Sequence, residues 1–507
     1  MENVITTSRP AVSRRAFMAG AAGLGLAAGV GALASTARAA EPIWDQEADV
    51  VVVGLGAGGS TAAVAALEEG ASVCVIEANG RGGGSTVVSG GLLYMGGTQL
   101  QKDLGIEDSV ENMYAYVSKA AGPMADPDLI KTFCDTSPDL FDWLIAHGVT
   151  FEGTADTEAH AVVAPAGVCL SYSGNERNGE YAAVATPAPR GHTPVGGGMG
   201  MFEPLEKIVD EQATVLYETR GTALVTDDGG AVIGVLAEDA EGAQVAVKAN
   251  KGVVLSCGAF TYNDALLENV DPLALQAASR TGVPNDQGDG IKMGMRIGAA
   301  VKNMAIINTQ LFLYRFGDMP CGIVVDARGI RFMSEAGYGT WIGRGVEKRT
   351  PEACWVIVDA PMHENTADAL GMQEYEPAFE AETLEELAEK IGCAPGTLVA
   401  SVERYNALVE AGEDVDYGKE PEYLKKIETG PFYAYDCSCK MLGFHTLGGL
   451  KITTKSEVVD LNGEVIPGLY AAGRTSCGIY GEYPGSGTSI ADGMTFGRIA
   501  GRSAAAR

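Results

Sequence analysis

Short apolar runs that stop at a glycine or an acid predict buried strands near the start of the chain. The run Val51 to Val53 stops at Gly54, and the run Ser72 to Ile76 stops at Glu77. Between them, residues 60–67 are small and rich in alanine, which favours a helix. A strand, a glycine turn, a helix and a second strand predict a βαβ unit, and therefore an α/β fold with a parallel sheet.

The same pattern returns late in the chain. Residues 468–473 predict a strand that ends in small residues, residues 481–489 are a glycine-rich loop, and a helix is expected over 490–505. Elsewhere the periodicity predicts helices over 109–121 and 126–147, and an antiparallel meander over 213–260.

The composition changes between these two regions. Residues 300–435 are richer in acidic residues, Met, Tyr and Phe, and Thr383 to Glu386 fits a capping box that begins an amphipathic helix. We therefore predict a nucleotide-binding domain in two parts, 46–299 and 436–507, split by an inserted domain at 300–435.

The first glycine loop has the spacing that dinucleotide binding requires. Gly54 permits the tight turn out of the strand, Gly56 lets the backbone approach a pyrophosphate, and Gly59 lets helix and strand pack closely. The helix N-terminus faces the phosphates, and Glu77 can accept a hydrogen bond from a ribose hydroxyl. This loop alone leaves NAD and FAD open.

A second loop of small residues follows at 80–86 and 89–91. It exposes many backbone N–H groups with little side-chain bulk, so it can wrap a pyrophosphate and lie against a flat ring. A flexible loop without a ligand is the alternative.

Charge and hydropathy exclude several classes of partner. The formal net charge is -30, which argues against nucleic acid and anionic membrane surfaces as partners. After the N-terminal region no segment has 18 consecutive apolar residues, so we expect no membrane span in the mature chain.

The N-terminal region predicts export. Ser13 to Met18 contains a twin-arginine pattern, an apolar stretch follows, and residues 37–39 fit a cleavage site. We predict a twin-arginine signal peptide at 1–39 and a periplasmic or otherwise extracytoplasmic protein. An uncleaved membrane anchor is the alternative.

The cysteines and histidines predict no metal site. None of the ten cysteines forms a Cys-x-x-Cys motif, and the five histidines form no spaced pair. Without Cys-x-x-Cys-His we also expect no covalent haem. His192 lies in a loop, where a structural or exposed histidine is the more common case.

An ordered set of motifs resembles one family. The set consists of the first glycine loop with Glu77, residues 83–85, 288–290, 331–335, 445–449 and 468–473. It resembles the FAD-dependent fumarate reductase and 3-ketosteroid dehydrogenase superfamily (FAD-binding 2 type flavoproteins) over residues 46–507. The resemblance implies FAD, and a Rossmann-like FAD-binding domain split by an inserted α+β capping (substrate) domain. It also implies hydride exchange between flavin N5 and an activated carbon–carbon double bond.

The resemblance also implies which residues bind the cofactor. They are Gly54, Gly56, Gly58, Gly59, Glu77, Ala78, Gly83, Gly84, Ser85, Thr86, Ser89, Gly90, Gly91, Ala223, Ser256, Gly258, Asp289, Gly473, Arg474, Ser489 and Ile490. Asp289 stands at a predicted helix start, where it is equally suited to be an N-cap.

The substrate side departs from the fumarate reductases. Their second carboxylate-binding arginine would fall near Pro484, and their proton-donating arginine near Tyr338 or Gly339. Their histidine and Thr-Glu pair find no match near residues 308–322. Because a dicarboxylate needs two fixed cations, we expect that fumarate is not the substrate.

The same positions resemble ketosteroid dehydrogenases. Tyr483 to Gly487 looks like their Tyr-Pro-Gly-x-Gly loop, in which the tyrosine hydroxyl and a glycine N–H polarise a ketone. Tyr338 lies where those enzymes carry a tyrosine acid/base, and His445 matches a histidine that contacts a substrate carbonyl or carboxylate. Ordinary half-buried tyrosines are the alternative reading of Tyr338 and Tyr483.

We therefore predict an exported FAD-dependent reductase of an enoate or enone, with Tyr338, Tyr483, His445 and Gly487 as catalytic residues. Arg331 or Arg344 is expected to lower the pKa of Tyr338. The alternatives are a 3-ketosteroid dehydrogenase that runs in the oxidative direction and a flavin electron-transfer protein. Electrons are expected from a separate protein, a quinol-linked cytochrome.

Overall fold

The computed structural model describes residues 42–157, 167–311, 317–370 and 376–507. Residues 44–507 form one compact unit. The predicted signal peptide lies outside the described residues, so its structure stays a prediction. Within the described residues no helix is both long and apolar enough to cross a membrane.

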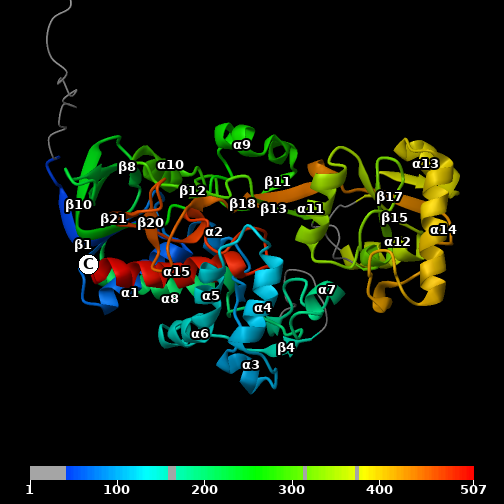
Figure 1. The fold of residues 1–507 in the computed structure, drawn as a ribbon, viewed down its shortest axis with the longest axis horizontal. Coiled ribbons are helices and arrows are strands. Elements are labelled where there is room, and N and C mark those ends of the chain that lie inside the picture. Colours follow the sequence, from blue (N-terminus) through cyan, green and yellow to red (C-terminus); the bar gives the residue numbers. More distant parts are fainter. Residues whose placement is uncertain (1–41, 158–166, 312–316, 371–375) are drawn as a thin grey trace, which may run out of the picture. The chain divides into compact units, whose positions relative to one another are not determined.

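Within the described residues, an eight-stranded sheet runs in the order β20-β21-β10-β1-β2-β7, with β9 and β8 continuing from β10 (Figure 1). Its parallel strands are β1 (Gln46–Val53), β2 (Val73–Ile76), β7 (Thr214–Leu216), β10 (Gln244–Leu255) and β21 (Val465–Ala471). Its antiparallel strands are β8 (Arg220–Thr226), β9 (Val232–Glu238) and β20 (Glu457–Val459). The predicted βαβ unit and the meander are both present.

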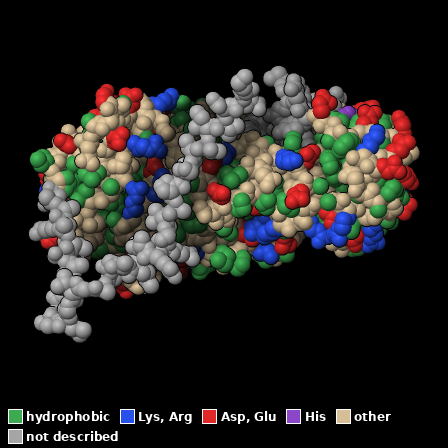
Figure 2. All heavy atoms as spheres, turned by 90° about the horizontal axis from the view of Figure 1, so that it is seen from above, with side chains coloured by type: hydrophobic (Ala, Val, Ile, Leu, Met, Phe, Trp, Pro, Cys, Tyr) green, Lys and Arg blue, Asp and Glu red, His purple; other side chains and the backbone are tan. Residues whose placement is uncertain are grey.

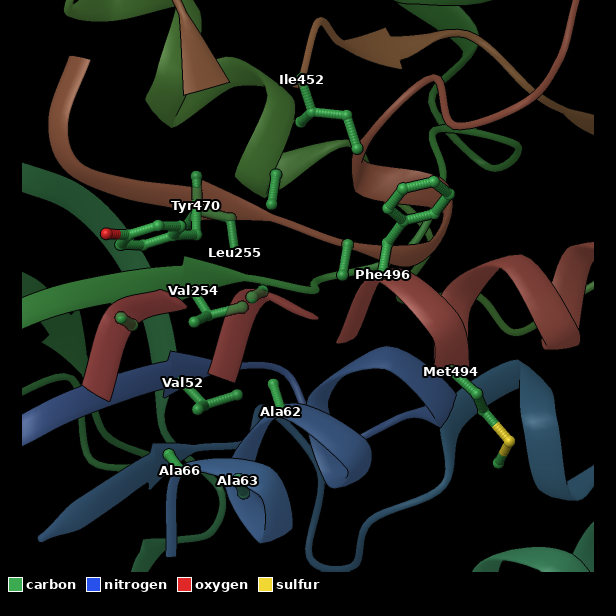
Figure 3. Packing of buried hydrophobic residues seen from close by; sticks show 14 of the residues in the cluster. Val52, Ala62, Ala63, Ala66, Val254, Leu255, Ile452, Tyr470, Met494 and Phe496 are labelled. Carbon is green, nitrogen blue, oxygen red and sulfur yellow. The ribbon is translucent and has the colours of Figure 1, made fainter. Parts of the chain in front are cut away.

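Helices from distant parts of the chain pack together on this sheet. They are α1 (Ala57–Glu68) and α15 (Thr488–Ala505). A Cβ atom on Gly497 would lie 2.3 Å from the Gly58 carbonyl oxygen, and one on Gly501 would lie 2.1 Å from that of Ala62. Only glycine permits so close a contact, and Figure 3 shows Ala62 of α1 and Phe496 of α15 in the shared core.

A second sheet lies within the middle of the chain. Its antiparallel strands run in the order β14 (Ile323–Asp326), β15 (Cys354–Val358), β17 (Phe432–Asp436) and β16 (Phe379–Ala381). Its helices are α11 (Gly339–Arg349), α12 (Ala360–Leu370), α13 (Leu384–Ile391) and α14 (Pro395–Ala411). These elements bury a hydrophobic cluster of their own. The fold class is thus the predicted one, a parallel α/β sheet interrupted by an α+β insertion, while the exact domain limits stay predictions.

The N-cap half of the predicted capping box is present in this insertion. Thr383 Oγ1 accepts a hydrogen bond from the Glu386 N–H at 3.2 Å and caps α13. Figure 2 shows acidic side chains gathered over the end of the molecule that carries α13, where Glu385, Glu386 and Glu389 are exposed. The negative charge of this surface repels anionic partners.

A third sheet connects the two regions. β13 (Ile307–Leu311) pairs antiparallel with β18 (Leu442–Thr446), which also pairs with β11 (Ser279–Arg280). The register places Asn308 opposite His445 and Gln310 opposite Gly443. Asn308, Gln310 and His445 of this sheet line the cavity described below.

Other elements complete the described fold. The segment expected as helix over 126–147 divides into α5 (Pro127–Asp135) and α6 (Ser137–Ala146), because Pro138 begins a new helix. Further helices are α2 (Gly84–Val87), α3 (Gln99–Asp103), α4 (Val110–Ala120), α7 (Gly179–Ala182), α8 (Gly197–Gln212), α9 (Asp264–Val270) and α10 (Asp289–Arg296). Further strands are β3 (Leu93–Tyr94), β4 (Thr154–Asp156), β5 (Val168–Ser171), β6 (Gly191–His192), β12 (Val301–Lys302) and β19 (Gly449–Leu450).

Candidate active site

A cavity of ≈ 570 Å³ opens where the parallel strands end, and Val53, Ile76 and Ser256 contribute to its wall. The carboxyl ends of parallel strands are where open α/β sheets bind ligands. A cavity of this volume suits a small molecule or cofactor.

The glycines of the first loop differ in function: two allow close backbone packing and one leaves open space at the cavity. A Cβ on Gly54 would lie 2.4 Å from the Ser256 carbonyl oxygen, and one on Gly59 would lie 1.9 Å from that of Gly54, so both serve close backbone packing. A Cβ on Gly56 would meet no atom closer than 3.8 Å and would project into open space at the cavity. Gly56 therefore leaves room for a ligand.

Glu77 joins the first loop to the second strand. Its Oε2 accepts a hydrogen bond from the Leu55 N–H at 2.8 Å, and its Oε1 accepts from the N–H of Asn79 at 2.9 Å. The side chain is buried and lines the cavity. It holds the glycine loop in place and presents a carboxylate to the ligand.

The second glycine loop forms another wall. Cβ atoms on Gly84 and Gly90 would meet no atom within 4 Å. Thr86 Oγ1 accepts from the Ala57 N–H at 3.0 Å, which ties this loop to the start of α1. Ser85 Oγ donates to Asp286 Oδ2 at 2.8 Å. The loop is thus held by its side chains while its backbone faces the cavity.

Most residues expected to bind the cofactor line this one cavity. They are Gly54, Gly56, Gly58, Glu77, Ala78, Gly84, Ser85, Thr86, Ser89, Gly90, Gly91, Ser256, Gly258, Asp289, Gly473, Arg474, Ser489 and Ile490. The structure does not bring Gly59, Gly83 and Ala223 to it. Gly59 packs on the Gly54 carbonyl and Gly83 against Val87, and on β8 the wall contains Arg220 and Gly221 rather than Ala223.

Some lining residues were not expected from the sequence. They are Asn79, Thr219, Arg220, Asp286, Asn308, Gln310 and Ser486, among others. Ser486 lies inside the loop from Tyr483 to Gly487, which the resemblance had already indicated as part of the site. Asn308 and Gln310 carry one weak signal, since they belong to a run of three polar residues with apolar residues at both ends.

Carboxylates hold the two arginines that line the cavity within the described part of the chain. Arg220 Nη2 lies 2.5 Å from Asp289 Oδ2, which belongs to the first turn of α10 and also contacts Lys292 at 2.8 Å. Arg474 Nη2 lies 3.3 Å from Asp286 Oδ2. Both guanidinium groups are therefore ion-paired before any ligand is considered.

Tyr338 reaches the cavity from the inserted region. It precedes α11, and its hydroxyl hydrogen-bonds to the hydroxyl of Ser486 in the last glycine-rich loop. The Tyr338 N–H donates to Asn175 Oδ1 at 2.7 Å, and the Ser486 N–H donates to the Ser173 carbonyl at 2.7 Å. Backbone contacts to residues 173–175 thus hold both partners.

Tyr483 and His445 lie next to each other on the same wall. Their rings are 5.3 Å apart and meet edge to face at 86°. Burial raises the pKa of Tyr483, and the nearby Tyr338 raises it further. Burial also lowers the pKa of His445 well below its ordinary range, helped by the charge of Arg474. At neutral pH the cavity therefore faces an uncharged phenol and an uncharged imidazole.

The expected arginine next to Tyr338 is absent from the cavity wall. Arg331 donates to Glu335 Oε2 at 2.7 Å and to Asp414 Oδ2 at 2.6 Å in a buried cluster of the insertion. Arg344 pairs with Glu482. Neither lines the cavity, so the expectation that one of them acts on Tyr338 finds no support in the structure.

His192 is structural. It is fully buried, its Nε2 lies 2.8 Å from Thr98 Oγ1, and its Nδ1 lies 2.8 Å from the Arg190 carbonyl oxygen. Burial lowers its pKa to about 4. Among the described residues no group of His, Cys, Asp and Glu is arranged to hold a metal ion.

The cavity fits a flavin dinucleotide. Side chains are missing where a flat ring and a pyrophosphate need room, since Cβ atoms on Gly56, Gly84, Gly90 and Gly473 would meet nothing closer than 3.8 Å. The first residues of α1 and α15 also line the cavity, and the unpaired N–H groups of a helix N-terminus favour phosphate.

Comparison with known proteins identifies the family. Residues 49–490 match the model of the FAD binding domain family of the FAD-binding 2 type. In structure, the chain is similar to the 3-ketosteroid-Δ4-(5α)-dehydrogenase from Rhodococcus jostii RHA1 in complex with 4-androstene-3,17-dione. The TM-score is 0.85 at 36% identity, over 93% of this chain and 99% of the other.

Two curated relatives resemble it in sequence. The fumarate reductase (cytochrome) of Shewanella frigidimarina is 30% identical over 90% of this chain and 77% of its own length. The urocanate reductase of Eggerthella lenta is 31% identical over 91% of this chain and 75% of its own length. Together with the cavity, these comparisons show that the chain belongs to the FAD binding domain family of fumarate reductases and 3-ketosteroid dehydrogenases, as an FAD-dependent oxidoreductase that acts on CH–CH groups.

Proposed function

We propose that the protein reduces a carbon–carbon double bond conjugated to a carbonyl group, in an enone or enoate other than fumarate. One observation carries the proposal: Tyr338, His445, Tyr483 and Gly487 line the same cavity as the FAD-binding loops. The relatives' names support the reaction class, because they include reductases and dehydrogenases of unsaturated compounds.

The two glycine loops, Glu77 and the first turn of α15 would hold the cofactor. The chemistry that FAD supplies when bound is hydride transfer at its N5 atom. Gly59 and Gly83 support this cradle from behind: Gly59 packs against the Gly54 carbonyl and Gly83 against the Val87 side chain.

Tyr483 and the Gly487 N–H bind the carbonyl oxygen of the substrate. Negative charge develops on this oxygen during reduction, and preorganised donors in a site without water stabilise it. Because burial raises the pKa of Tyr483, its hydroxyl keeps its proton and remains a donor. His445 flanks this group, with its ring edge to face against that of Tyr483.

Tyr338 donates the proton to the α-carbon. The Ser486 hydroxyl, which hydrogen-bonds to that of Tyr338, orients the phenol. After the transfer it relays a proton to the phenolate while it takes one up from solvent. In the reverse direction the same tyrosine would take the proton from the α-carbon.

A second candidate is the oxidation of a 3-ketosteroid by these residues acting in reverse. It is favoured by the similarity to the Rhodococcus jostii dehydrogenase, which extends over almost the whole of both chains. A flavin electron-transfer protein is not favoured, because the relatives named above are enzymes of substrate turnover.

The twin-arginine pattern supports the further proposal that the enzyme is exported to the periplasm or beyond the cytoplasmic membrane. Electrons for the reduction would then come from a separate donor protein, a quinol-linked cytochrome. The relative named fumarate reductase (cytochrome) supports a link to a cytochrome.

The test compares wild-type protein with Tyr338→Phe. Reduction is driven by a chemically reduced viologen dye against enones and enoates, and oxidation is followed with a dye acceptor on the saturated ketones. Loss of a proton donor should lower the turnover rate about 10²- to 10⁴-fold. FAD content and the flavin spectrum should not change.

Tyr217→Phe is the control, since the Tyr217 hydroxyl donates to Asp210 on the protein surface. It should keep the wild-type rate. A Tyr338→Phe enzyme with wild-type turnover of every substrate that wild-type protein accepts would remove Tyr338 from the mechanism.

A further inference from the structure

One side of the cavity consists of neutral polar side chains from two paired strands. β13 supplies Asn308 and Gln310, and β18 supplies His445, which lies opposite Asn308 in the register. Alternate residues of a strand face the same side, and all three line the cavity. Asn308, Gln310 and His445 are called the polar wall below.

Each member of the polar wall has a buried atom without a hydrogen-bond partner among the residues that the structure describes. These atoms are Asn308 Oδ1, Gln310 Nε2 and His445 Nε2. The three residues are only 2%, 8% and 7% exposed. Buried polar groups in native proteins are almost always paired, because leaving them unpaired costs free energy. Three such atoms on one wall indicate a ligand that pairs with them.

The donors and acceptors of the polar wall follow from the pair of Asn308 and His445. Asn308 Nδ2 lies 3.4 Å from His445 Nδ1, and an amide NH₂ group can only donate. Because burial keeps the imidazole neutral, its Nδ1 accepts and its proton is on Nε2. The cavity therefore meets N–H donors from His445 and Gln310 and an acceptor from Asn308.

The polar wall offers no fixed positive charge. Arg220 and Arg474, the cavity arginines of the described chain, already contact Asp289 and Asp286. A carboxylate is bound most strongly by charged donors, whereas a ketone or hydroxyl needs only neutral partners. The wall therefore fits a neutral ligand better than an anionic one.

We infer that the polar wall selects an uncharged substrate, an unsaturated ketone with a second neutral oxygen group. The reacting carbonyl lies at Tyr483 and Gly487, and the second oxygen, a carbonyl or hydroxyl, is held by Gln310 and is the specificity-determining contact. Gln310 lies two residues from Asn308, about 6.8 Å along the strand. It is therefore offset from the end of the wall where His445, opposite Asn308, contacts Tyr483. This inference rests on the proposed function and names its substrate class.

The first test separates a ligand-binding amide from a structural one. Gln310→Met keeps the side-chain length and removes the unpaired N–H₂ group. The melting temperature should rise by about 2 °C, because an unsatisfied buried group is gone. Gln101→Met is the matched control: Gln101 is 1% exposed, and its Nε2 donates to the Pro189 carbonyl oxygen at 2.9 Å and to Asp108 at 3.1 Å. This control should melt at a lower temperature than wild type.

The second test measures binding without turnover. Oxidised holoenzyme is titrated with 4-androstene-3,17-dione, fumarate and urocanate, and the flavin absorption spectrum reports the dissociation constant. The dione should perturb the spectrum, and the two carboxylates should not do so at comparable concentrations. Gln310→Met and Gln310→Glu should each weaken dione binding about tenfold, and Gln101→Met should not change it.

Several results would overturn the inference. They are tighter binding of a carboxylate than of the dione, a wild-type spectrum that none of the probes perturbs, or a Gln310→Met protein that melts lower and binds as wild type does. The proposed function fails separately: if the dione binds as expected but Tyr338→Phe turns it over at the wild-type rate, the polar wall stands and the proton donor is wrong.

Discussion

At the scale of single residues, glycines of the same motif act in different ways. Gly59 has no room for a methyl group, because a Cβ would lie 1.9 Å from a backbone oxygen, whereas a Cβ on Gly56 would enter the cavity. The spacing Gly-x-Gly-x-x-Gly predicts close packing at Gly59, which agrees with the Cβ distance there, and ligand approach at Gly56, which stays a prediction. It could not predict that Ala223 lies beyond the wall, since that depends on where the β8 strand meets the cavity.

Two substitutions test whether Gly59 serves backbone packing and Gly56 leaves room for the ligand. Gly59→Ala should prevent folding, because the clash is with backbone that cannot move. Gly56→Ala should fold but bind FAD at least about tenfold more weakly, since the methyl group occupies ligand space. Soluble yield, circular dichroism and FAD titration of apoprotein measure both effects.

Gly396→Ala is the control for these variants. Gly396 is exposed in α14, and a Cβ there meets no atom within 4 Å, so this variant should gain about 0.5–1 kcal/mol of stability. A stably folded Gly59→Ala protein with normal FAD content would contradict the packing role.

The candidate catalytic residues show what residue patterns can and cannot reveal. Tyr338 and Tyr483 were predicted from the resemblance to ketosteroid dehydrogenases, and both line the cavity. Asn308 and Gln310 were missed because their importance depends on pairing with β18, more than a hundred residues later in the chain. Arg331 was expected nearby, yet buried carboxylates of the insertion hold it.

At the scale of elements, α15 carries a buried acid inside the core. Asp492 is 1% exposed, and its Oδ1 accepts a hydrogen bond from the Ile479 N–H at 3.2 Å. Burial raises its pKa from 3.8 to about 8. The folded protein therefore holds a proton here that the unfolded chain releases above about pH 4.

The pH dependence of stability follows from this shift. Between about pH 4 and pH 8 the folded state binds more protons than the unfolded one, so the contribution of Asp492 to stability falls as the pH rises. Asp492→Asn keeps the acceptor oxygen but cannot ionise. At pH 9 it should be more stable than wild type by about 2–5 kcal/mol, with little difference at pH 4. Urea denaturation of holoenzyme across this range measures it.

Asp142→Asn, a change of an exposed acid on α6, is the control and should follow the wild-type profile. If the free energy of unfolding changed with pH in the same way for wild type and Asp492→Asn, Asp492 would not titrate with a raised pKa.

The bounds of helices and strands also show which features the sequence can predict and which it cannot. The βαβ unit was predictable because β-branched residues, glycines and small helix residues follow each other within one short stretch. The single helix expected over 126–147 is in fact two, since Pro138 suits the first turn of a new helix rather than the interior of a long one.

At the scale of the whole molecule, the described core begins only at β1. The buried hydrophobic residues of the described chain start at Ala48. The proposed export signal at 1–39 precedes these residues in the sequence, and we expect its effect to be on location.

Replacing Arg14 and Arg15 by lysine tests the export proposal. The double variant should remain in the cytoplasm, because the twin-arginine pattern is an export address. It should have normal FAD content, because the residues that line the cavity start at Val53. Cell fractionation with an antibody and flavin fluorescence measures both. Arg9→Lys, outside the pattern, should be exported as wild type is, and equal export of the double variant would exclude this route.

The contact between α1 and α15 has a consequence for the order of events in the cell. The wall that holds FAD contains residues from both the beginning of the fold and positions 487–490, and α15 must pack against α1 through Gly497 and Gly501 to place them. A growing chain on the ribosome has the first loop long before the last one. The cofactor site is therefore complete only once synthesis has passed α15, and we expect FAD to be loaded after that point rather than when the first loop emerges.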